Sequence, residues 1–206
     1  MMKDLLENDF VSHYRLSKNG SINVVSTSST DFDLEDDPVL IYPSGEGTAK
    51  YSNPSNKEVN IIRYELFFKS LPQLFQKDKL NCDLFVYTFD GQYFLLNELT
   101  DKNKKKGKKR KHAISQMFTT LQLISAVSTI NAFINQHVIK QCCYFNKKYQ
   151  SPRDIRAISA FNRINSYSQN GYKMSDSDIE SYGFELWEFS GNQTFVLRKL
   201  RDEINY

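Results

Sequence analysis

The chain has 206 residues, of which 40% are hydrophobic and 14% aromatic, enough for one domain with a substantial core. No apolar run is long enough to span a membrane, and the first ten residues lack the hydrophobic stretch of a signal peptide. Three cysteines, two of them adjacent at Cys142 and Cys143, do not make a disulfide framework. We therefore expect a cytoplasmic protein with reduced thiols and no membrane association.

The formal net charge of +3 conceals one strongly basic segment. Residues 102–111 (KNKKKGKKRK) contain eight Lys or Arg, which leaves 19 basic against 24 acidic residues elsewhere. Gly107 and the density of like charge favour a flexible loop. An acidic cluster lies earlier in the chain; we interpret it as a solvated loop, with folding over the basic segment as the alternative. The acidic cluster consists of Asp31, Asp33, Glu35, Asp36 and Asp37.

The pattern divides the chain into an N-terminal extension of strands and loops, residues 1–57, and a main α/β domain, residues 58–206. Within the extension, residues 22–25 and 39–42 are rich in Ile, Val and Leu and predict short strands. Stretches rich in Ser, Thr, Asp, Gly and Pro separate them and predict turns.

The main domain is predicted to alternate helices and strands, because its apolar spacing switches between the two periods. Its expected elements are a helix from residue 58 to near Pro72, a hairpin over 82–100, a helix over 113–138, a strand over 140–145, a helix from Pro152 to Ser166, a short helix from a Ser175 cap to Tyr182, and a second hairpin of 184–189 and 193–200 around Gly191-Asn192. This order indicates an α/β (α+β) fold with a mixed central β-sheet and flanking helices.

The hairpin over residues 82–100 (CDLFVYTFDGQYFLLNELT) carries the most informative pair of residues. Asp90-Gly91 favours a two-residue turn, because both residues tolerate positive φ. Counting outward from that turn places Asp83 directly opposite Glu98, roughly 5 Å apart at Cβ. Like charges at that distance repel, and aromatic neighbours on the same face desolvate them. We therefore expect a divalent cation to compensate the pair.

Two alternatives remain open for this pair. A three-residue turn with a bulge would shift the register by one and move Glu98 to the opposite face. A hairpin at the edge of a sheet would let both carboxylates reach water.

The order of elements over residues 58–146 resembles the PD-(D/E)xK, or restriction-endonuclease-like, nuclease superfamily. The resemblance implies a restriction-endonuclease-like core in which an Asp and a Glu on adjacent strands bind Mg²⁺, often with a Glu from the preceding helix. Carried onto this chain, it makes Asp83, Glu98 and Glu65 the metal ligands.

The motif departs from the family two residues after Glu98, where Thr100 replaces the usual Lys. That Lys would orient the attacking water and stabilise the charge that develops on phosphate. Lys102, two residues further along the same face, takes this role if the strand continues. Gln116 corresponds to a Gln that some members keep near the site. The Tyr that usually follows it is absent, since Thr120 stands there.

The sequence therefore predicts a metal-dependent nuclease that hydrolyses phosphodiester bonds in DNA or RNA with Mg²⁺ or Mn²⁺ as cofactor. The basic segment begins beside the predicted site and would draw a nucleic-acid backbone towards it. A homodimer would suit cleavage of a duplex. The alternatives are a non-catalytic nucleic-acid-binding domain and a protein-interaction domain, with an inactive nuclease-like fold. The residues expected to contact nucleic acid are Lys104, Lys105, Lys106, Lys108, Lys109, Arg110 and Lys111.

Overall fold

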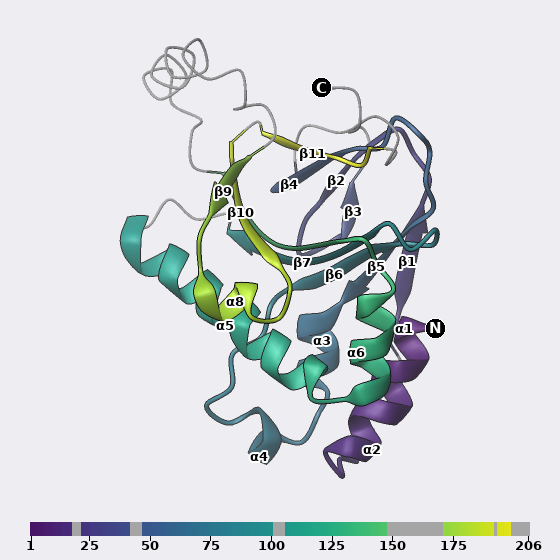
Figure 1. Cartoon of the computed structure of the whole chain (residues 1–206), viewed down its shortest axis with the longest axis vertical. Coiled ribbons are helices and arrows are strands. Elements are labelled where there is room, and N and C mark those ends of the chain that lie inside the picture. Colours follow the sequence, from purple (N-terminus) through teal and green to yellow (C-terminus); the bar gives the residue numbers. More distant parts are fainter. Residues whose placement is uncertain (18–21, 42–46, 101–105, 148–170, 192, 199–206) are drawn as a thin grey trace.

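A computed structural model describes residues 1–17, 22–41, 47–100, 106–147, 171–191 and 193–198 of the chain (Figure 1). Within these residues the strands form a seven-stranded mixed sheet and a four-stranded sheet, and the helices gather beside the larger one. The predicted class, an α+β fold with a mixed central sheet and flanking helices, is confirmed.

The seven-stranded sheet is antiparallel at its two ends and parallel in the middle. Strand β7 runs parallel to β8, and β8 runs parallel to β10; the other neighbours are antiparallel. A parallel pair needs a crossover connection, which the helices between β7 and β8 provide. In spatial order the strands are β1 (Val24–Thr27), β5 (Val59–Arg63), β6 (Leu84–Thr88), β7 (Tyr93–Thr100), β8 (Ile139–Asn146), β10 (Glu185–Ser190) and β9 (Tyr172–Met174).

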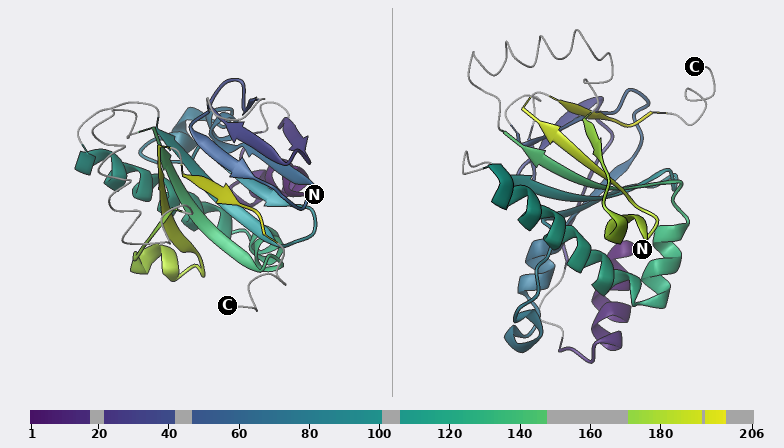
Figure 2. Two further views of the ribbon diagram at one scale, coloured as in Figure 1. Left: turned by 90° about the horizontal axis from the view of Figure 1, so that it is seen from above. Right: turned by 60° about the vertical axis from the view of Figure 1, so that its left-hand side comes forward.

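The smaller sheet covers one face of the larger sheet, and the helices cover the other (Figure 2). Side chains alternate between these faces along each strand. On β6, Phe85 packs towards the helices, whereas Leu84 and Val86 pack towards the smaller sheet. Two hydrophobic cores result. The strands of the smaller sheet are β11 (Thr194–Val196), β4 (Ala49–Ser52), β2 (Asp31–Leu34) and β3 (Leu40–Ile41).

The helical layer is built from segments distant in the chain. Helix α5 crosses the layer diagonally, and α6 and the N-terminal helices lie beside its C-terminal end (Figure 1). The described helices are α1 (Met2–Asp4), the π-helix η1 (Leu5–Phe10), α2 (Val11–His13), α3 (Tyr64–Lys69), α4 (Gln73–Gln76), α5 (Lys106–Ser125), α6 (Ser128–Asn135) and α8 (Ser177–Glu180).

The helix predicted from residue 58 to Pro72 is wrong in its first part. Residues Val59–Arg63 form β5, and only Tyr64–Lys69 is helical before Pro72. Strand β5 lies between β1 and β6 with both faces covered, so its apolar residues do not alternate with polar ones. Glu65 is nevertheless helical, as predicted.

The predicted helix over residues 113–138 is two helices, and the basic loop before it is partly helical. α5 begins at Lys106 and ends at Ser125, and α6 follows after a break. The flexible loop predicted for 102–111 is therefore wrong from residue 106 onward. Burial of α5 against the sheet through residues such as Met117 and Leu121 offsets the repulsion within its basic first turns.

The second predicted hairpin is wrong, because its two strands belong to different sheets. β10 pairs with β8 and β9, whereas β11 pairs in parallel with β4. The chain crosses from one sheet to the other at Gly191, whose φ is +61°. Phe189 and Phe195 then face each other across the gap, with ring centroids 5.6 Å apart.

Among the remaining predictions, the strand over residues 140–145 is confirmed by β8. The short helix expected after Ser175 is α8, capped by Asp176, whose side chain accepts a hydrogen bond from the Ile179 amide. The helix expected from Pro152 to Ser166 lies outside the described residues.

The N-terminal segment contributes to both sheets and to the helical layer. The strands expected at 22–25 and 39–42 are found as β1 and β3, shifted by one or two residues. The sequence pattern does not predict the helical residues 2–13, although Met2, Leu6 and Phe10 are fully buried there.

No single helix among the described residues is long and apolar enough to cross a membrane. Residues 109–125 of α5 pass that test only together with α6, and the two bend by 111° at the break between them.

Candidate carboxylate site

Glu98 lies on β7 and Asp83 directly precedes β6, at the end of a ladder that keeps the register predicted from the sequence. The ladder ends at the pair Leu84 and Asn97, and the Asp83 amide also donates to the Asn97 carbonyl at 3.1 Å, so Asp83 and Leu84 both lie against Asn97 beside Glu98. The Asp83 carboxylate accepts a hydrogen bond of 2.6 Å from the amide of Leu99. The pairing of Leu84 with Asn97 excludes the one-residue shift of register. The predicted two-residue turn is wrong: β6 ends at Thr88, β7 begins at Tyr93, the Gly91 amide donates to the Thr88 carbonyl at 3.1 Å, and of Asp90 and Gly91 only Gly91 has a positive φ.

Glu98 is one of the most buried carboxylates among the described residues. Its exposed fraction is 6%, and its Oε2 atom is buried without a hydrogen-bond partner in that part of the chain. Burial raises the pKa of Glu98 well above its usual value, and the charge of Asp83 raises it further, while a hydrogen bond with Gln116 lowers it. The ionised form of Glu98 is therefore disfavoured unless a cation compensates it.

Asp83 is less buried than Glu98 but is also perturbed. Burial raises the pKa of Asp83 to about 7, although the hydrogen bond from the Leu99 amide acts in the opposite direction. The charges of Asp36 and Glu65 contribute to this rise. The two carboxylates therefore do not both ionise readily near neutral pH, since each ionisation hinders the other.

Helix α5 clamps the start of β6 and so positions Asp83. The Cys82 amide donates to Thr120 Oγ1 at 2.9 Å, and Thr120 Oγ1 donates in turn to the Gln116 carbonyl. Gln116 Nε2 donates to the Asn81 carbonyl at 2.9 Å. Gln116, a candidate from the sequence, thus contacts both the chain before Asp83 and the Glu98 carboxylate.

Glu65 lies beside the pair without joining it. Its amide donates to the Asp83 carbonyl at 3.1 Å, but its carboxylate pairs with Lys69 at 2.5 Å. Among the described residues, no group of three or more His, Cys, Asp or Glu side chains is arranged to hold a metal ion. The structure therefore brings together Asp83 and Glu98 and leaves Glu65 as a charged neighbour.

Asp36 is a neighbour that sequence reasoning missed. It follows β2, and its charge raises the pKa of both Asp83 and Glu98. The solvated loop predicted for its acidic cluster is wrong in part, because Asp31 and Asp33 lie on β2 and Asp33 is fully buried. Nothing local in the sequence links Asp36 to a hairpin almost fifty residues later.

A second buried carboxylate, Glu188, lies on the same sheet face two strands away. The register aligns Glu98 with Tyr144 on β8, and Tyr144 with Glu188 on β10. Glu188 is 4% exposed, accepts a hydrogen bond of 3.0 Å from Asn146 Nδ2 and pairs with Arg110 of α5. Sequence reasoning missed Glu188, although it stands at an inward position of the alternating run 184–189, where Phe184 and Leu186 are apolar.

The basic residues expected to bind nucleic acid differ in their exposure and in their ion pairs. Arg110 is paired with Glu188. Lys111 is exposed on the first turns of α5. Lys102, Lys104 and Lys105 lie outside the described residues, and the side chains of Lys106 and Lys108 are also outside them. Lys109, on the same turns, is half-buried.

Thr100, at the position of the family's usual Lys, is the last residue of β7. It pairs with Asn146 on β8, and its side chain is hydrogen-bonded to Tyr144, on the face that carries Glu98. Thr100 therefore supplies a hydroxyl to this face, at the position where the resemblance drawn from the sequence would require a Lys.

Comparisons with known proteins return nothing similar to this chain. A scan against protein-family models, a search of curated proteins and a search of solved structures each found no match.

Proposed function

We propose that the protein is a metal-dependent nuclease that hydrolyses phosphodiester bonds in DNA or RNA, with Asp83 and Glu98 as ligands of a Mg²⁺ or Mn²⁺ ion. One observation carries the proposal: the buried Glu98 has a carboxylate oxygen without a partner among the described residues, and a second carboxylate, Asp83, lies beside it. A buried group left in this state is costly unless a ligand or proton completes it.

The two carboxylates suit a hard divalent cation. Mg²⁺ prefers oxygen ligands and keeps several waters, so one or two protein carboxylates are sufficient. When bound, the ion would neutralise charge on the phosphate and make a water molecule more acidic. Glu65 and Asp36 lie near enough to add negative potential to the site.

The chain's own residues prepare the site. The Leu99 amide fixes the Asp83 carboxylate, and the contacts of α5 with residues 81 and 82 fix the backbone before it. Glu98 gives up a proton before it binds a cation, so binding is favoured as pH rises. In the proposal, Lys102 takes the place of the Lys that Thr100 replaces, and the basic segment attracts the nucleic-acid backbone.

The connectivity around the pair also supports the proposal. The hairpin of β6 and β7 is followed by α5, which crosses over to the parallel strand β8. This order is the one on which the resemblance to the PD-(D/E)xK superfamily rests. All three cysteines are free and buried, which suits the cytoplasmic location that we propose.

A second candidate function is nucleic-acid binding without cleavage, or binding of a protein partner, on an inactive nuclease-like fold. Two observations favour it: Thr100 stands where the family has Lys, and the Glu65 carboxylate is held by Lys69. In this alternative the basic segment still binds a partner, but the protein does not hydrolyse phosphodiester bonds.

The test is a cleavage assay on labelled single- and double-stranded DNA and RNA in Mg²⁺ or Mn²⁺. We expect cleavage by the wild type, loss of at least a hundredfold in Glu98→Gln, and no change in Glu180→Gln, an exposed Glu on α8. Binding without cleavage, unchanged in Glu98→Gln, would support the second candidate. If the protein neither cleaves nor binds any of these substrates, both nucleic-acid functions are rejected.

A further inference from the structure

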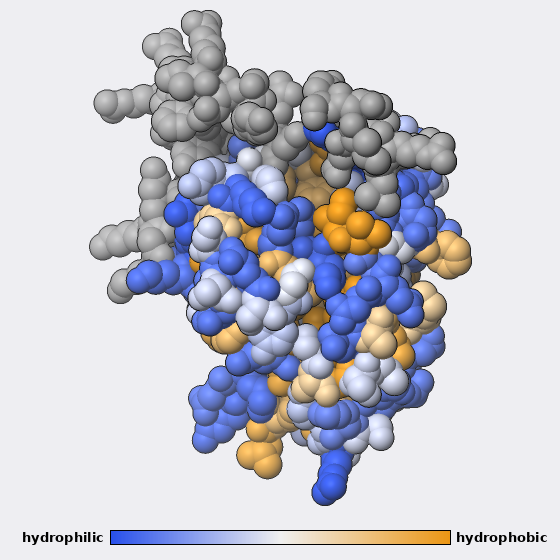
Figure 3. Space-filling model, viewed as in Figure 1, coloured by the Kyte–Doolittle hydropathy of each residue, from blue (hydrophilic) through white to orange (hydrophobic). Residues whose placement is uncertain are grey.

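A cavity of about 220 Å³ lies on the opposite face of the seven-stranded sheet, between β8 and β10 on one side and β11 on the other. In the region between β11 and the strands beneath it, Figure 3 shows a hollow in which hydrophobic side chains gather among hydrophilic ones. Glu98 faces the helices, where Gln116 of α5 reaches it, so this cavity and Glu98 lie on different faces of the sheet.

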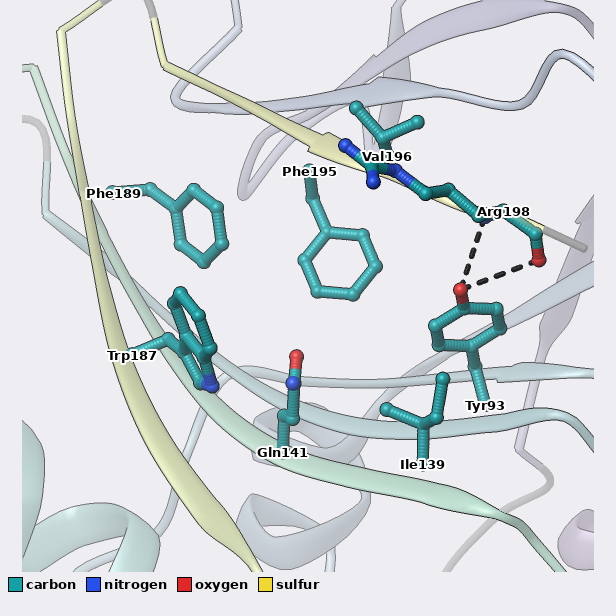
Figure 4. Close-up of a pocket in the computed structure, with 8 residues that line it drawn as sticks. All are labelled: Tyr93, Ile139, Gln141, Trp187, Phe189, Phe195, Val196 and Arg198. Carbon is teal, nitrogen blue, oxygen red and sulfur yellow. Dashed lines mark hydrogen bonds between the residues drawn. The ribbon is translucent and has the colours of Figure 1, made fainter. Parts of the chain in front are cut away.

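Aromatic rings form the walls of this cavity (Figure 4). Trp187 and Phe189 are near-parallel, at 26° with centroids 6.5 Å apart, and Phe195 faces Phe189 from β11. Phe189 and Phe195 are buried, whereas Trp187 is only partly buried. The cavity therefore offers ring faces on which a planar aromatic ligand can stack.

Gln141 places one hydrogen-bond acceptor among these rings. Its Nε2 and Trp187 Nε1 each donate to Glu185 Oε2 at 3.0 Å. An ionised carboxylate only accepts, which fixes the orientation of the amide. The Gln141 oxygen points up between Trp187 and Phe195 in Figure 4, and no donor among the described residues reaches it. It is free to accept from an amino group of a ligand.

Arg198 places a cation at the rim. Its backbone is held by Tyr93, whose hydroxyl accepts from the Arg198 amide at 3.0 Å. Its side chain runs back towards Val196 at the edge of the cavity (Figure 4). No carboxylate pairs with this guanidinium in the part of the chain that the structure describes. An unpaired Arg beside an aromatic pocket suits a phosphate group.

We propose that this cavity is a nucleotide-binding site in which the base stacks against Trp187, its amino group donates to Gln141, and its phosphate binds Arg198. The volume is below the range of about 300–1,000 Å³ typical of small-molecule sites, which suits a single base and not a large cofactor. A purely apolar ligand would leave both polar groups unused. The site goes beyond the proposed nuclease and does not depend on it.

The occupant has two sources with the same chemistry, a free mononucleotide and the terminal nucleotide of a strand. Trp187 is the only tryptophan in the chain, so its fluorescence reports stacking in this cavity. The probes are adenosine 5′-monophosphate, adenosine, inorganic phosphate and a short oligodeoxyadenylate, titrated in EDTA.

We expect saturable quenching by the monophosphate and affinity about ten- to a hundredfold lower for adenosine, because adenosine has no phosphate to accept charge-assisted hydrogen bonds from Arg198. In Arg198→Gln the two ligands should bind equally, and Gln141→Leu should weaken both. Arg63→Gln, a substitution at the end of β5 that does not line the cavity, should bind as the wild type does. Tighter binding of the oligonucleotide than of the monophosphate would support the strand end as the source. The reverse order would support the free nucleotide.

Absence of quenching by every probe would overturn the proposal. It would also be overturned if indole competed as well as the monophosphate and Arg198→Gln had no effect, because the cavity would then be a general apolar pocket. Glu98→Gln should retain nucleotide binding, so failure of this proposal and failure of the nuclease proposal are distinguishable.

Discussion

The Asp83 carboxylate accepts a hydrogen bond from the amide of Leu99, the residue that follows Glu98, so the two acids lie beside each other at one end of the β6–β7 ladder. This hydrogen bond fixes the Asp83 carboxylate against the backbone of β7. Their pKa values are both raised, Asp83 to about 7 and Glu98 well above its usual value. The pair therefore destabilises the metal-free protein, and the predictions below follow from that cost.

The first prediction concerns pH and the stability of the metal-free protein. The folded-state pKa of Asp83 is about 7, above its ordinary value of 3.8. Between pH 3.8 and about 7, the folded state therefore keeps a proton on Asp83 that the unfolded state has lost. Stability is therefore greatest at low pH for this group and falls as pH rises from about 4 to about 7. Asp83→Asn keeps the acceptor for Leu99 and removes the titration. At pH 8 in EDTA it should be more stable than the wild type by about 1–3 kcal/mol, less than the full linkage value of about 4, because Asp83 keeps some exposure.

Urea denaturation between pH 4 and pH 8 measures this difference. Asp78→Asn is the matched control, since Asp78 is exposed and its positive φ of 59° suits Asn. Equal pH dependence in the wild type and Asp83→Asn would show that Asp83 titrates normally.

The second prediction concerns the clamp between α5 and the start of β6. Thr120→Val preserves shape but removes the acceptor of the buried Cys82 amide. An unsatisfied buried donor should lower the free energy of unfolding by about 1–3 kcal/mol. Cleavage of nucleic acid by this variant should also fall, because Asp83 directly follows Cys82 in the chain. Thr119→Val, one residue earlier and partly exposed, should change the free energy of unfolding by no more than about 0.5 kcal/mol and leave cleavage unchanged. A loss in Thr119→Val similar to that in Thr120→Val would rule out a specific clamp.

The third prediction concerns Arg110. Its guanidinium pairs with Glu188, so Arg110→Gln leaves a buried carboxylate without its cation. Because Arg110 is itself 46% exposed, the expected destabilisation is moderate, about 1–2 kcal/mol. Adding Glu188→Gln should restore most of it in a double-mutant cycle measured by urea denaturation. Additive losses in the double variant would mean that the two side chains do not interact.

The fourth prediction concerns nucleic-acid binding and salt. Neutralising Lys104, Lys105, Lys106 and Lys108 to Gln should weaken binding and reduce the slope of log K against log salt, by roughly 0.7–0.9 for each phosphate that the variant no longer neutralises. Fluorescence anisotropy with a labelled oligonucleotide at several salt concentrations measures the slope. Replacing Lys3 and Lys77, which lie outside the basic segment, should leave it unchanged. An unchanged slope in the four-lysine variant would assign binding to another surface.

Apolar periodicity and turn residues predict those elements whose conformation depends mainly on neighbours in the sequence. The apolar runs on the two sides of Asp90-Gly91 are sufficient for the register of β6 and β7, although the turn between them differs from the predicted one. This register brings Asp83 and Glu98 to the same end of the ladder. The sequence pattern of β5 resembles a helix because strands on both sides and cores on both faces remove its alternation. Gly191-Asn192 has the composition of a hairpin turn, yet the packing of Phe195 in the space between the sheets decides where β11 goes.

The rest of the site depends on contacts between distant segments. Asp36, just after the end of β2, acts on the carboxylate pair through its charge. Arg110 contacts Glu188, although the two residues are 78 positions apart in the sequence. No periodicity encodes such contacts. The aromatic cavity is similar, since Trp187, Gln141 and Arg198 come from three segments that the sequence does not place together.

The measurement that tests the central claim most directly is a Mn²⁺ and Mg²⁺ titration of thermal unfolding, comparing the wild type with the Asp83→Asn/Glu98→Gln double variant at pH 7.5. A cation that binds only the folded state raises its stability by RT ln(1 + [L]/Kd), about 2.7 kcal/mol at a hundred times Kd. We predict that the melting temperature of the wild type rises with cation concentration and that the double variant does not respond. Equal responses, or no response in the wild type, would contradict a carboxylate metal site at Asp83 and Glu98.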